Sequence, residues 1–218
     1  MTLLGSLVLL FTGCTYGLTL PSSEPEPEGP IQVGKAELRE RKALLPSAVT
    51  GPEPPPPEPA FTADRCNDLS TGGRPIDDCI SGTISCGETI IGHTRGGVRK
   101  FDSTFYKKKF CTPDTTDHDS GDERVYRLVM PDGDWHATIT LDTPCADLDL
   151  AAILWNDDTC PTNAHIVNRC EMWPQDGTAR EEVEIVSQKA SQWLVVVEGK
   201  DDEEGAFGLN VQCWKGLY

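Results

Sequence analysis

Apolar and polar residues alternate along much of the chain after residue 120, as in β-strands with one buried face. Tyr126, Leu128 and Met130 share one face of such a run, opposite Arg127. Residues 192–198 are nearly all apolar, which favours a central strand. The pattern predicts strands over 125–130, 137–142, 147–154, 181–187, 192–198 and 207–213, with earlier ones near 83–86 and 88–91. Short strands of this kind, separated by turns, predict an all-β antiparallel sandwich.

Turn-forming residues separate the predicted strands, for example Pro131–Asp134 and Pro174–Gly177. Helical periodicity is weak outside residues 35–45, where good helix formers follow one another. The basic run Lys107–Lys109 is predicted to be a solvated loop or a strand edge. The globular part is therefore expected to contain little helix.

The first residues resemble the export signal of a bacterial lipoprotein. Leu3–Phe11 is apolar but far shorter than the ~20 residues that span a bilayer, so it is typical of a signal-peptide core. Thr12 and Gly13 precede Cys14, as small residues precede the lipidated cysteine of the lipobox. The resemblance implies a signal peptide over 1–13 and acylation of Cys14, palmitate included. Thr15, rather than an aspartate, favours the outer membrane of a Gram-negative bacterium.

Residues 14–63 are predicted to be a disordered Pro/Glu-rich tether. Residues 21–60 hold eleven of the chain's 17 prolines, a composition that favours extended polyproline II and cannot bury a core. The remaining residues, 64–218, have the length of one domain. The tether would act as a spacer between the lipid anchor and this domain.

Eight cysteines lie between Cys66 and Cys213, apart from Cys14. An even number behind an export signal predicts four disulfides in an oxidising compartment. Cys160–Cys170 and Cys86–Cys111 are the expected local pairs. For the other four, Cys79–Cys213 with Cys66–Cys145 is favoured, and Cys66–Cys79 with Cys145–Cys213 stays an alternative.

Several of the strands together resemble the bacterial pre-peptidase C-terminal domain. The runs that carry the resemblance are Gly121–Leu128, Ala137–Leu141, Ala146–Leu150, Glu182–Ile185, Trp193–Gly199 and Gly205–Val211. The resemblance implies a jelly-roll-like β-sandwich, usually a non-catalytic appendage of a secreted protease or a free-standing surface module. Some members of that family bind calcium or polymers such as collagen.

Charge and motifs exclude several functions. The chain has a net charge of −16, and the seven acids and four bases of residues 1–60 leave −13 on the rest, so nucleic acid is not an expected partner. His93, His118, His136 and His165 have no metal-ligand spacing, and the chain has no nucleophile elbow or phosphate-binding loop. The chain is therefore not expected to be an enzyme or to hold a small-molecule cofactor.

Acidic residues offer one candidate cation site. Asp147 and Asp149 are expected on one face of a strand, and calcium takes six to eight oxygen ligands from several segments. Further acids lie at Asp157–Asp158, at Asp201–Glu204, and at Asp114, Asp117, Asp119 and Asp122. Asp147 and Asp149 are the predicted calcium ligands, and a solvated acidic surface is the alternative.

The leading functional hypothesis is a lipid-anchored surface module that binds an extracellular protein or polymer. The second is a structural or accessory envelope lipoprotein that partners a secreted protease or another envelope protein. The third is a hydrolase without a recognisable signature.

Overall fold

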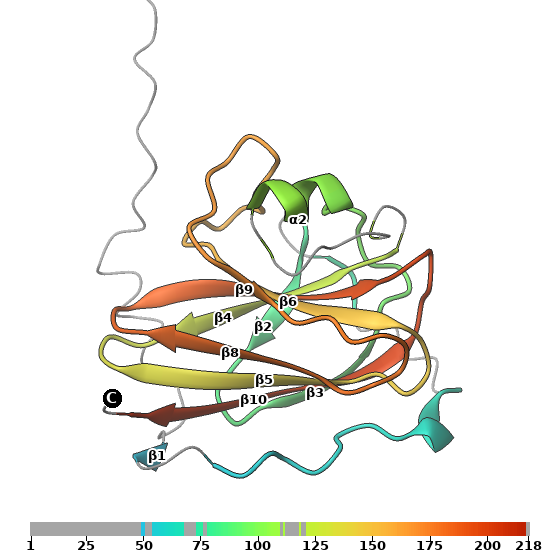
Figure 1. The fold of residues 1–218 in the computed structure, drawn as a ribbon, viewed down its shortest axis with the longest axis horizontal. Coiled ribbons are helices and arrows are strands. Elements are labelled where there is room, and N and C mark those ends of the chain that lie inside the picture. The colour runs from blue at the N-terminus through green and yellow to red at the C-terminus, as the bar shows by residue number, and fades with distance from the viewer. Residues whose placement is uncertain are drawn as a thin grey trace, which may run out of the picture. The chain divides into compact units, whose positions relative to one another are not determined.

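Two five-stranded sheets pack face to face in the computed structural model, which describes residues 49–50, 54–67, 73–75, 78–109, 111, 118 and 121–216 (Figure 1). Sheet A consists of β1 (Val49–Thr50), β3 (Thr89–His93), β5 (Trp135–Asp142), β8 (Glu181–Ser187) and β10 (Ala206–Lys215). Sheet B consists of β2 (Ile80–Ile84), β4 (Arg124–Met130), β6 (Leu148–Leu154), β7 (Cys170–Met172) and β9 (Ser191–Gly199). The described helices are α2 (Ser103–Lys109) and the short 3₁₀ helix η2 (Ala63–Arg65).

The strand order is that of a jelly roll. Sheet A runs β3–β10–β5–β8, and sheet B runs β4–β9–β6–β7. Successive strands from β3 to β10 therefore cross between the sheets, except β6 and β7, which is the double Greek key of a jelly roll. Two strands are added in parallel at the edges, β2 beside β4 and β1 beside β10. The predicted all-β, jelly-roll-like sandwich is confirmed.

The main core lies between the inner faces of the sheets. Tyr126, Leu128 and Met130 of β4 all point into it, as their alternation predicted. In β8, Val183 and Ile185 are buried whereas Glu182 and Glu184 are exposed. The period-two pattern thus marks the inward face of each of these strands.

A third layer covers the outer face of sheet B (Figure 1). It consists of α2, Cys111, His118 and the loop of residues 155–169. Phe105 and Tyr106 of α2 pack in a second core with Ile153, Leu194 and Val196 from that face. Sheet B is therefore apolar on both faces, which accounts for the apolar run in β9 that predicted a central strand.

The prediction of a loop or strand edge at Lys107–Lys109 is wrong, because these residues end α2. Lys109 is buried, and its ammonium group donates hydrogen bonds to the carbonyl oxygens of Asn163 and His165. Seven residues are too few to show a helical period, so the apolar contacts of the helix with sheet B decide its structure.

The domain begins before residue 64, the boundary expected from the sequence. Phe61 is buried against Gly208, where a Cβ atom would come within 2.8 Å of Phe61 Cβ. The Asp142 carboxylate accepts a hydrogen bond from Ala60 N at 2.6 Å and pairs with Arg180 Nε at 2.7 Å. Arg180 also donates to the carbonyl oxygen of Pro57 at 2.9 Å. Residues 57–61 are therefore fixed to sheet A, and we name them the strap.

Four disulfides join all eight cysteines of the domain. Cys66–Cys145 was predicted correctly, but the others are Cys79–Cys160, Cys86–Cys213 and Cys111–Cys170. The predicted pairs Cys160–Cys170, Cys86–Cys111 and Cys79–Cys213 are wrong, and so is the alternative Cys66–Cys79 with Cys145–Cys213. The predictions lacked the third layer: two of the actual disulfides join it to sheet B, and Cys86–Cys213 lies in the main core.

Some sequence-based predictions fall outside the described residues. These are the signal peptide, Cys14, most of the tether and the run of helix-forming residues at 35–45. Among the described residues, no helix is both long and apolar enough to cross a bilayer. Four disulfides are typical of proteins exported to an oxidising compartment.

Candidate functional site

A cluster of enclosed polar side chains lies between sheet B and the third layer. Asp149 of β6 and Glu198 of β9 are directly paired across the two strands, and each is 1% exposed. Two neighbouring carboxyl groups without water are unfavourable when both are charged. The groups around them therefore decide how this pair is tolerated.

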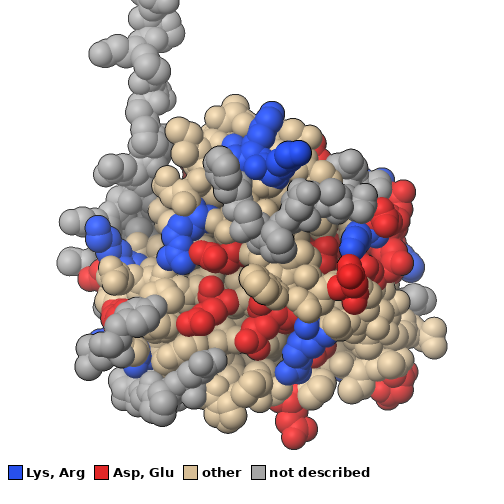
Figure 2. All heavy atoms as spheres, in the orientation of Figure 1, with Lys and Arg blue, Asp and Glu red and all other residues tan. Residues whose placement is uncertain are grey.

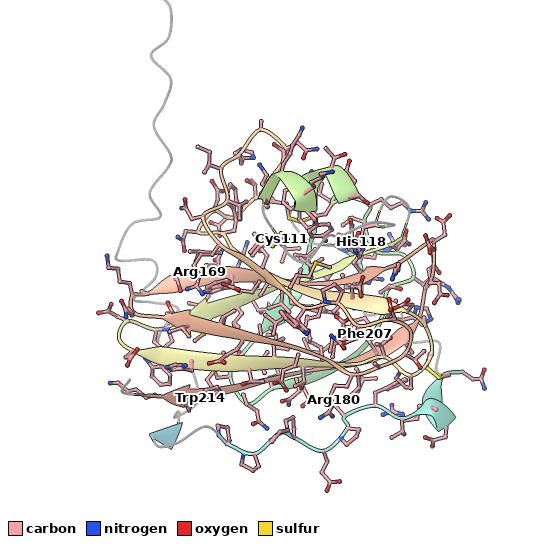
Figure 3. The ribbon with its side chains drawn as sticks, viewed as in Figure 1. Cys111, His118, Arg169, Arg180, Phe207 and Trp214 are labelled. Carbon is pink, nitrogen blue, oxygen red and sulfur yellow. A yellow bond between two sulfur atoms is a disulfide. The ribbon has the colours of Figure 1, made fainter. Side chains whose placement is uncertain are left out.

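His118 and Tyr106 contact the pair from the third layer, and Figure 3 labels His118 beside α2. His118 Nε2 lies 3.3 Å from Asp149 Oδ2, and its Nδ1 lies 3.7 Å from Glu198 Oε1. The Tyr106 hydroxyl donates a hydrogen bond to Glu198 Oε2, and the two rings meet edge to face at 5.3 Å. The cluster thus links α2 and residue 118 to the central strands of sheet B.

The carboxyl groups of the cluster keep their protons more tightly than exposed ones. Burial raises the pKa of Glu198, and the nearby charge of Glu123 adds to this effect. Burial also raises the pKa of Asp149 and of Glu181, and the nearby charge of Asp149 adds to the effect on Glu181. A protonated carboxyl can donate a hydrogen bond to its neighbour. Carboxyl groups that keep their protons make this acidic cluster compatible with burial.

Glu181 extends the cluster to the edge of sheet A. Its two carboxyl oxygens accept hydrogen bonds from Leu150 N and Gln175 N, both at 2.6 Å. Leu150 N lies beyond the end of β7, whose pairing with β6 starts at Ala151. Glu181 thus satisfies a donor that the short edge strand leaves open.

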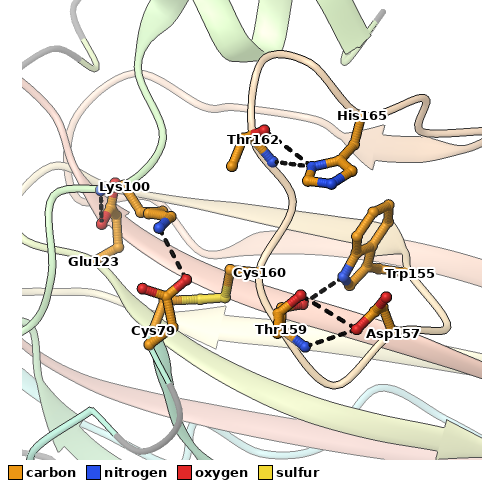
Figure 4. Close-up of polar contacts among 10 residues, drawn as sticks. Cys79, Lys100, Glu123, Trp155, Asp157, Thr159, Cys160, Thr162 and His165 are labelled. Atoms are coloured by element: carbon orange, nitrogen blue, oxygen red, sulfur yellow. Dashed lines mark hydrogen bonds and ion pairs between the residues drawn. A yellow bond between two sulfur atoms is a disulfide. The ribbon is translucent and has the colours of Figure 1, made fainter. Parts of the chain in front are cut away.

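Glu123 forms a second buried contact beside the cluster (Figure 4). Its carboxylate accepts hydrogen bonds from Lys100 N at 2.9 Å and Phe101 N at 2.7 Å. Burial outweighs these bonds and raises the pKa of Glu123 to about 7. Its neighbour Arg124, also fully buried, donates to the carbonyl oxygens of His93 and Arg95. These two side chains hold the segment before α2 against β4.

The predicted calcium ligands Asp147 and Asp149 have different surroundings. Asp149 lies inside the cluster, whereas the Asp147 carboxylate is partly exposed, 3.7 Å from Lys200 Nζ. The late acidic turn does approach, because Asp147 N donates to Glu203 Oε2 at 2.6 Å. Lys200 also lies 3.6 Å from Asp176, so an ammonium group supplies positive charge there.

The described residues do not by themselves form a cation site. No three His, Cys, Asp or Glu side chains within the ranges given above are grouped to hold a metal ion. Asp114, Asp117 and Asp119 lie outside those ranges, and Asp122 pairs with Arg99 at 2.8 Å. Calcium binding by Asp147 and Asp149 stays a prediction.

Sequence reasoning missed most of the cluster. His118 and Glu198 lack any motif, and Tyr106 lies in a helix that the pattern did not predict. One signal was available: Glu198 directly follows the apolar run of residues 193–197 in a central strand, where a buried carboxyl needs partners. The other acids have local roles. Asp157 accepts hydrogen bonds from Thr159 N and Oγ1 (Figure 4), and Asp158 pairs with Arg127.

The surface carries two large exposed apolar side chains among the described residues, Trp173 at 67% and Ile166 at 83% exposure. Gln175 N donates to Glu181 on one side of Trp173, and the Cys111–Cys170 disulfide fixes the chain on the other. Figure 2 shows basic side chains over α2 and several acidic ones at the sheet edges. Trp173 is therefore an exposed aromatic group, on an anchored stretch of backbone, in a predominantly acidic protein.

Comparisons with known proteins give one structural likeness. No protein-family model and no curated protein matches the chain. A solved structure, the pre-peptidase C-terminal domain of a collagenase from Bacillus anthracis, is 15% identical with a TM-score of 0.37. The match covers 64% of this chain and 99% of that one. At this identity and TM-score the likeness does not assign the chain to a family.

Proposed function

We propose that this protein is a non-catalytic binding module, anchored to the outer membrane of a Gram-negative bacterium through lipid on Cys14. Its tether would present the sandwich at the cell surface to an extracellular protein or polymer. The observation that carries the proposal is the exposed side chain of Trp173 on a backbone that is anchored on both sides. Tryptophan is enriched among residues that dominate binding energy, and a chain segment anchored beforehand loses less entropy on binding.

The polar cluster supports a non-catalytic role because it is closed to a substrate. Tyr106, His118, Asp149 and Glu198 are each at most 2% exposed. All eight cysteines of the domain are in disulfides, so none of them supplies a thiolate nucleophile. The arrangement of the four polar side chains fits a role in fixing the third layer to sheet B. The third layer in turn fixes the loops at the surface.

Ile166 is presented in the same manner. Its loop is held by the Cys79–Cys160 disulfide, by the bonds of Lys109 to Asn163 and His165, and by the bond of Thr162 N to His165 Nδ1 at 2.9 Å (Figure 4). Ile166 therefore offers a second apolar contact point, on an anchored loop, for a protein or polymer surface.

The binding proposal is tested by capture with the full-length protein and its Trp173→Ala variant. Extracellular and envelope fractions are cross-linked to each, with Glu182→Ala, an exposed change on β8, as the matched control. A component retained by the native protein and the control but lost with Trp173→Ala is the expected result. A protease or an envelope protein in that component would identify the accessory role; equal capture by all three proteins would refute binding through Trp173.

The anchor is tested independently. Mass spectrometry of the membrane fraction is expected to find an acylated peptide that begins at Cys14, and Cys14→Ser is expected to release the protein into the soluble fraction. A native protein that is soluble and cleaved elsewhere would contradict lipid anchoring without affecting the test of Trp173.

A further inference from the structure

An open pocket of about 520 Å³ lies where β6 ends beside the turn between β8 and β9. This volume falls in the range of pockets that bind small molecules. Leu154, Val186, Ala190 and Trp193 provide apolar wall, and the remaining lining is polar. The pocket does not include Trp173 or the buried cluster, so the function proposed above does not use it.

The charge of the pocket is opposite to that of the protein. Its lining contains Arg169 and Lys189 and no Asp or Glu, although the chain has a net charge of −16. Glu171 pairs with Arg169 at 2.8 Å and neutralises part of its charge. Lys189 has no ion pair with any residue that the structure describes. The pocket therefore favours an anionic ligand, with Lys189 as its main charge partner.

Arg169 is held in position rather than free to swing away (Figure 3). Its Nη1 donates to the carbonyl oxygen of Val186 at 2.8 Å, and its guanidinium lies 5.2 Å from the centre of the Trp193 ring. The guanidinium covers part of the ring, and Trp193 is only 1% exposed. The aromatic ring thus supports the wall of the pocket without being available for stacking.

The pocket also holds hydroxyl and amide groups. Ser187 Oγ donates to the carbonyl oxygen of Lys189 at 2.7 Å and lies 2.6 Å from Ser191 Oγ, which accepts from Trp193 Nε1 at 3.2 Å, so the two hydroxyls are bonded within the protein. The Asn156 carbonyl oxygen accepts from Gln192 N at 2.8 Å, which leaves its amide NH₂ for a ligand. Gln188 adds a second, exposed primary amide. Primary amides complement the hydroxyl groups of a sugar, because both kinds of group donate and accept hydrogen bonds.

We infer that this pocket binds a carboxylated sugar of the hexuronate type, free or as a unit of an acidic polysaccharide. Lys189 pairs with the carboxylate, Asn156 and Gln188 bond the ring hydroxyls, and Leu154 and Ala190 contact the carbon face of the ring. A single sugar of this size is expected to bind with a Kd on the order of 1 mM.

The test titrates the isotope-labelled full-length protein with sodium glucuronate and galacturonate by NMR. Glucose, acetate and a short peptide with a free carboxylate are the comparison ligands, and oligogalacturonate represents the polymer. Lys189→Gln is expected to weaken uronate binding about tenfold, the effect of losing one charge-assisted hydrogen bond. Gln188→Ala is a second variant in the pocket, and Lys107→Gln on α2 is the matched charge control.

The expected result is binding of uronates by the native protein and the Lys107→Gln control, weakened by both pocket variants. Tighter binding of the oligomer than of the monomer would identify a polysaccharide as the source of the sugar, and equal binding would identify the free sugar. Absence of uronate binding, equal binding of acetate or of the peptide, equal binding of glucose, or equal loss in Lys107→Gln would overturn the proposal. A failed Trp173 capture experiment would leave this result unaffected.

Discussion

The buried carboxyl of Glu123 predicts a fall in stability as pH rises. Its side chain is fully buried and its pKa is raised from 4.5 in a solvated state to about 7 in the folded protein. Between these values the folded protein keeps a proton that the unfolded chain has released. The free energy of unfolding therefore declines as pH rises through this window. Above pH 7 the folded protein bears the full cost of burying the charged Glu123 carboxylate.

The magnitude follows from the shift, since one pKa unit corresponds to ~1.4 kcal/mol. Most of the window from 4.5 to about 7 lies between pH 5 and pH 8, so Glu123 is expected to contribute a loss of about 2–3 kcal/mol over that range. Glu123→Gln removes the titration. One oxygen, Oε1, accepts from both Lys100 N and Phe101 N, so a glutamine can keep both bonds.

Urea unfolding of the native protein and Glu123→Gln is measured at pH 5, 6, 7 and 8, with exposed Glu182→Gln as control. The difference in unfolding free energy between native protein and Glu123→Gln is expected to change by about 2–3 kcal/mol from pH 5 to pH 8, in favour of the variant at the higher pH. If the variant only lost one contact, its unfolding free energy would fall by the same amount at every pH. Parallel pH profiles for the native protein and Glu123→Gln would refute the reasoning.

Three further predictions concern disulfides, strap and calcium. Peptide mapping without reduction is expected to find Cys79–Cys160, Cys86–Cys213, Cys111–Cys170 and Cys66–Cys145. Removal of one of these disulfides is expected to lower the free energy of unfolding by about 2–5 kcal/mol. Labelling of these cysteines by a thiol reagent in the native protein would contradict the prediction. Phe61→Ala is expected to lower the free energy of unfolding by about 2 kcal/mol, whereas exposed Pro59→Ala should leave it nearly unchanged; equal effects would show that the strap is not part of the domain. If Asp147 and Asp149 bind calcium, the melting temperature is higher in millimolar calcium than in chelator. The Asp147→Asn/Asp149→Asn double variant is then expected to lose this difference. Identical melting temperatures of the native protein in both solutions would exclude the site.

The sandwich itself was predictable because its strands bury one face against a single core. In β8, the alternation of Val183 and Ile185 with Glu182 and Glu184 specifies which side faces inward. The apolar run in β9 likewise predicted a central strand, which is confirmed. The layer that covers the outer face of this strand was not encoded locally, because α2 has only seven residues and is stabilised by contacts with residues far away in the chain.

The candidate site was less predictable than the fold for the same physical reason. Asp149 was singled out as an acid on a strand, but its partners His118, Glu198 and Tyr106 come together only through the jelly-roll pairing and the third layer. The disulfide errors share this origin. Cys111–Cys170 depends on where α2 ends on sheet B, which sequence spacing does not specify.

The most direct test of the account is capture at the cell surface by the lipid-anchored protein. Cells that display the native protein, Trp173→Ala or Glu182→Ala are exposed to labelled extracellular material, and the retained label is quantified per displayed molecule. The account predicts that the native protein and Glu182→Ala retain a saturable component that Trp173→Ala does not. Equal retention by all three, or none above cells without the protein, would contradict a binding module that acts through Trp173.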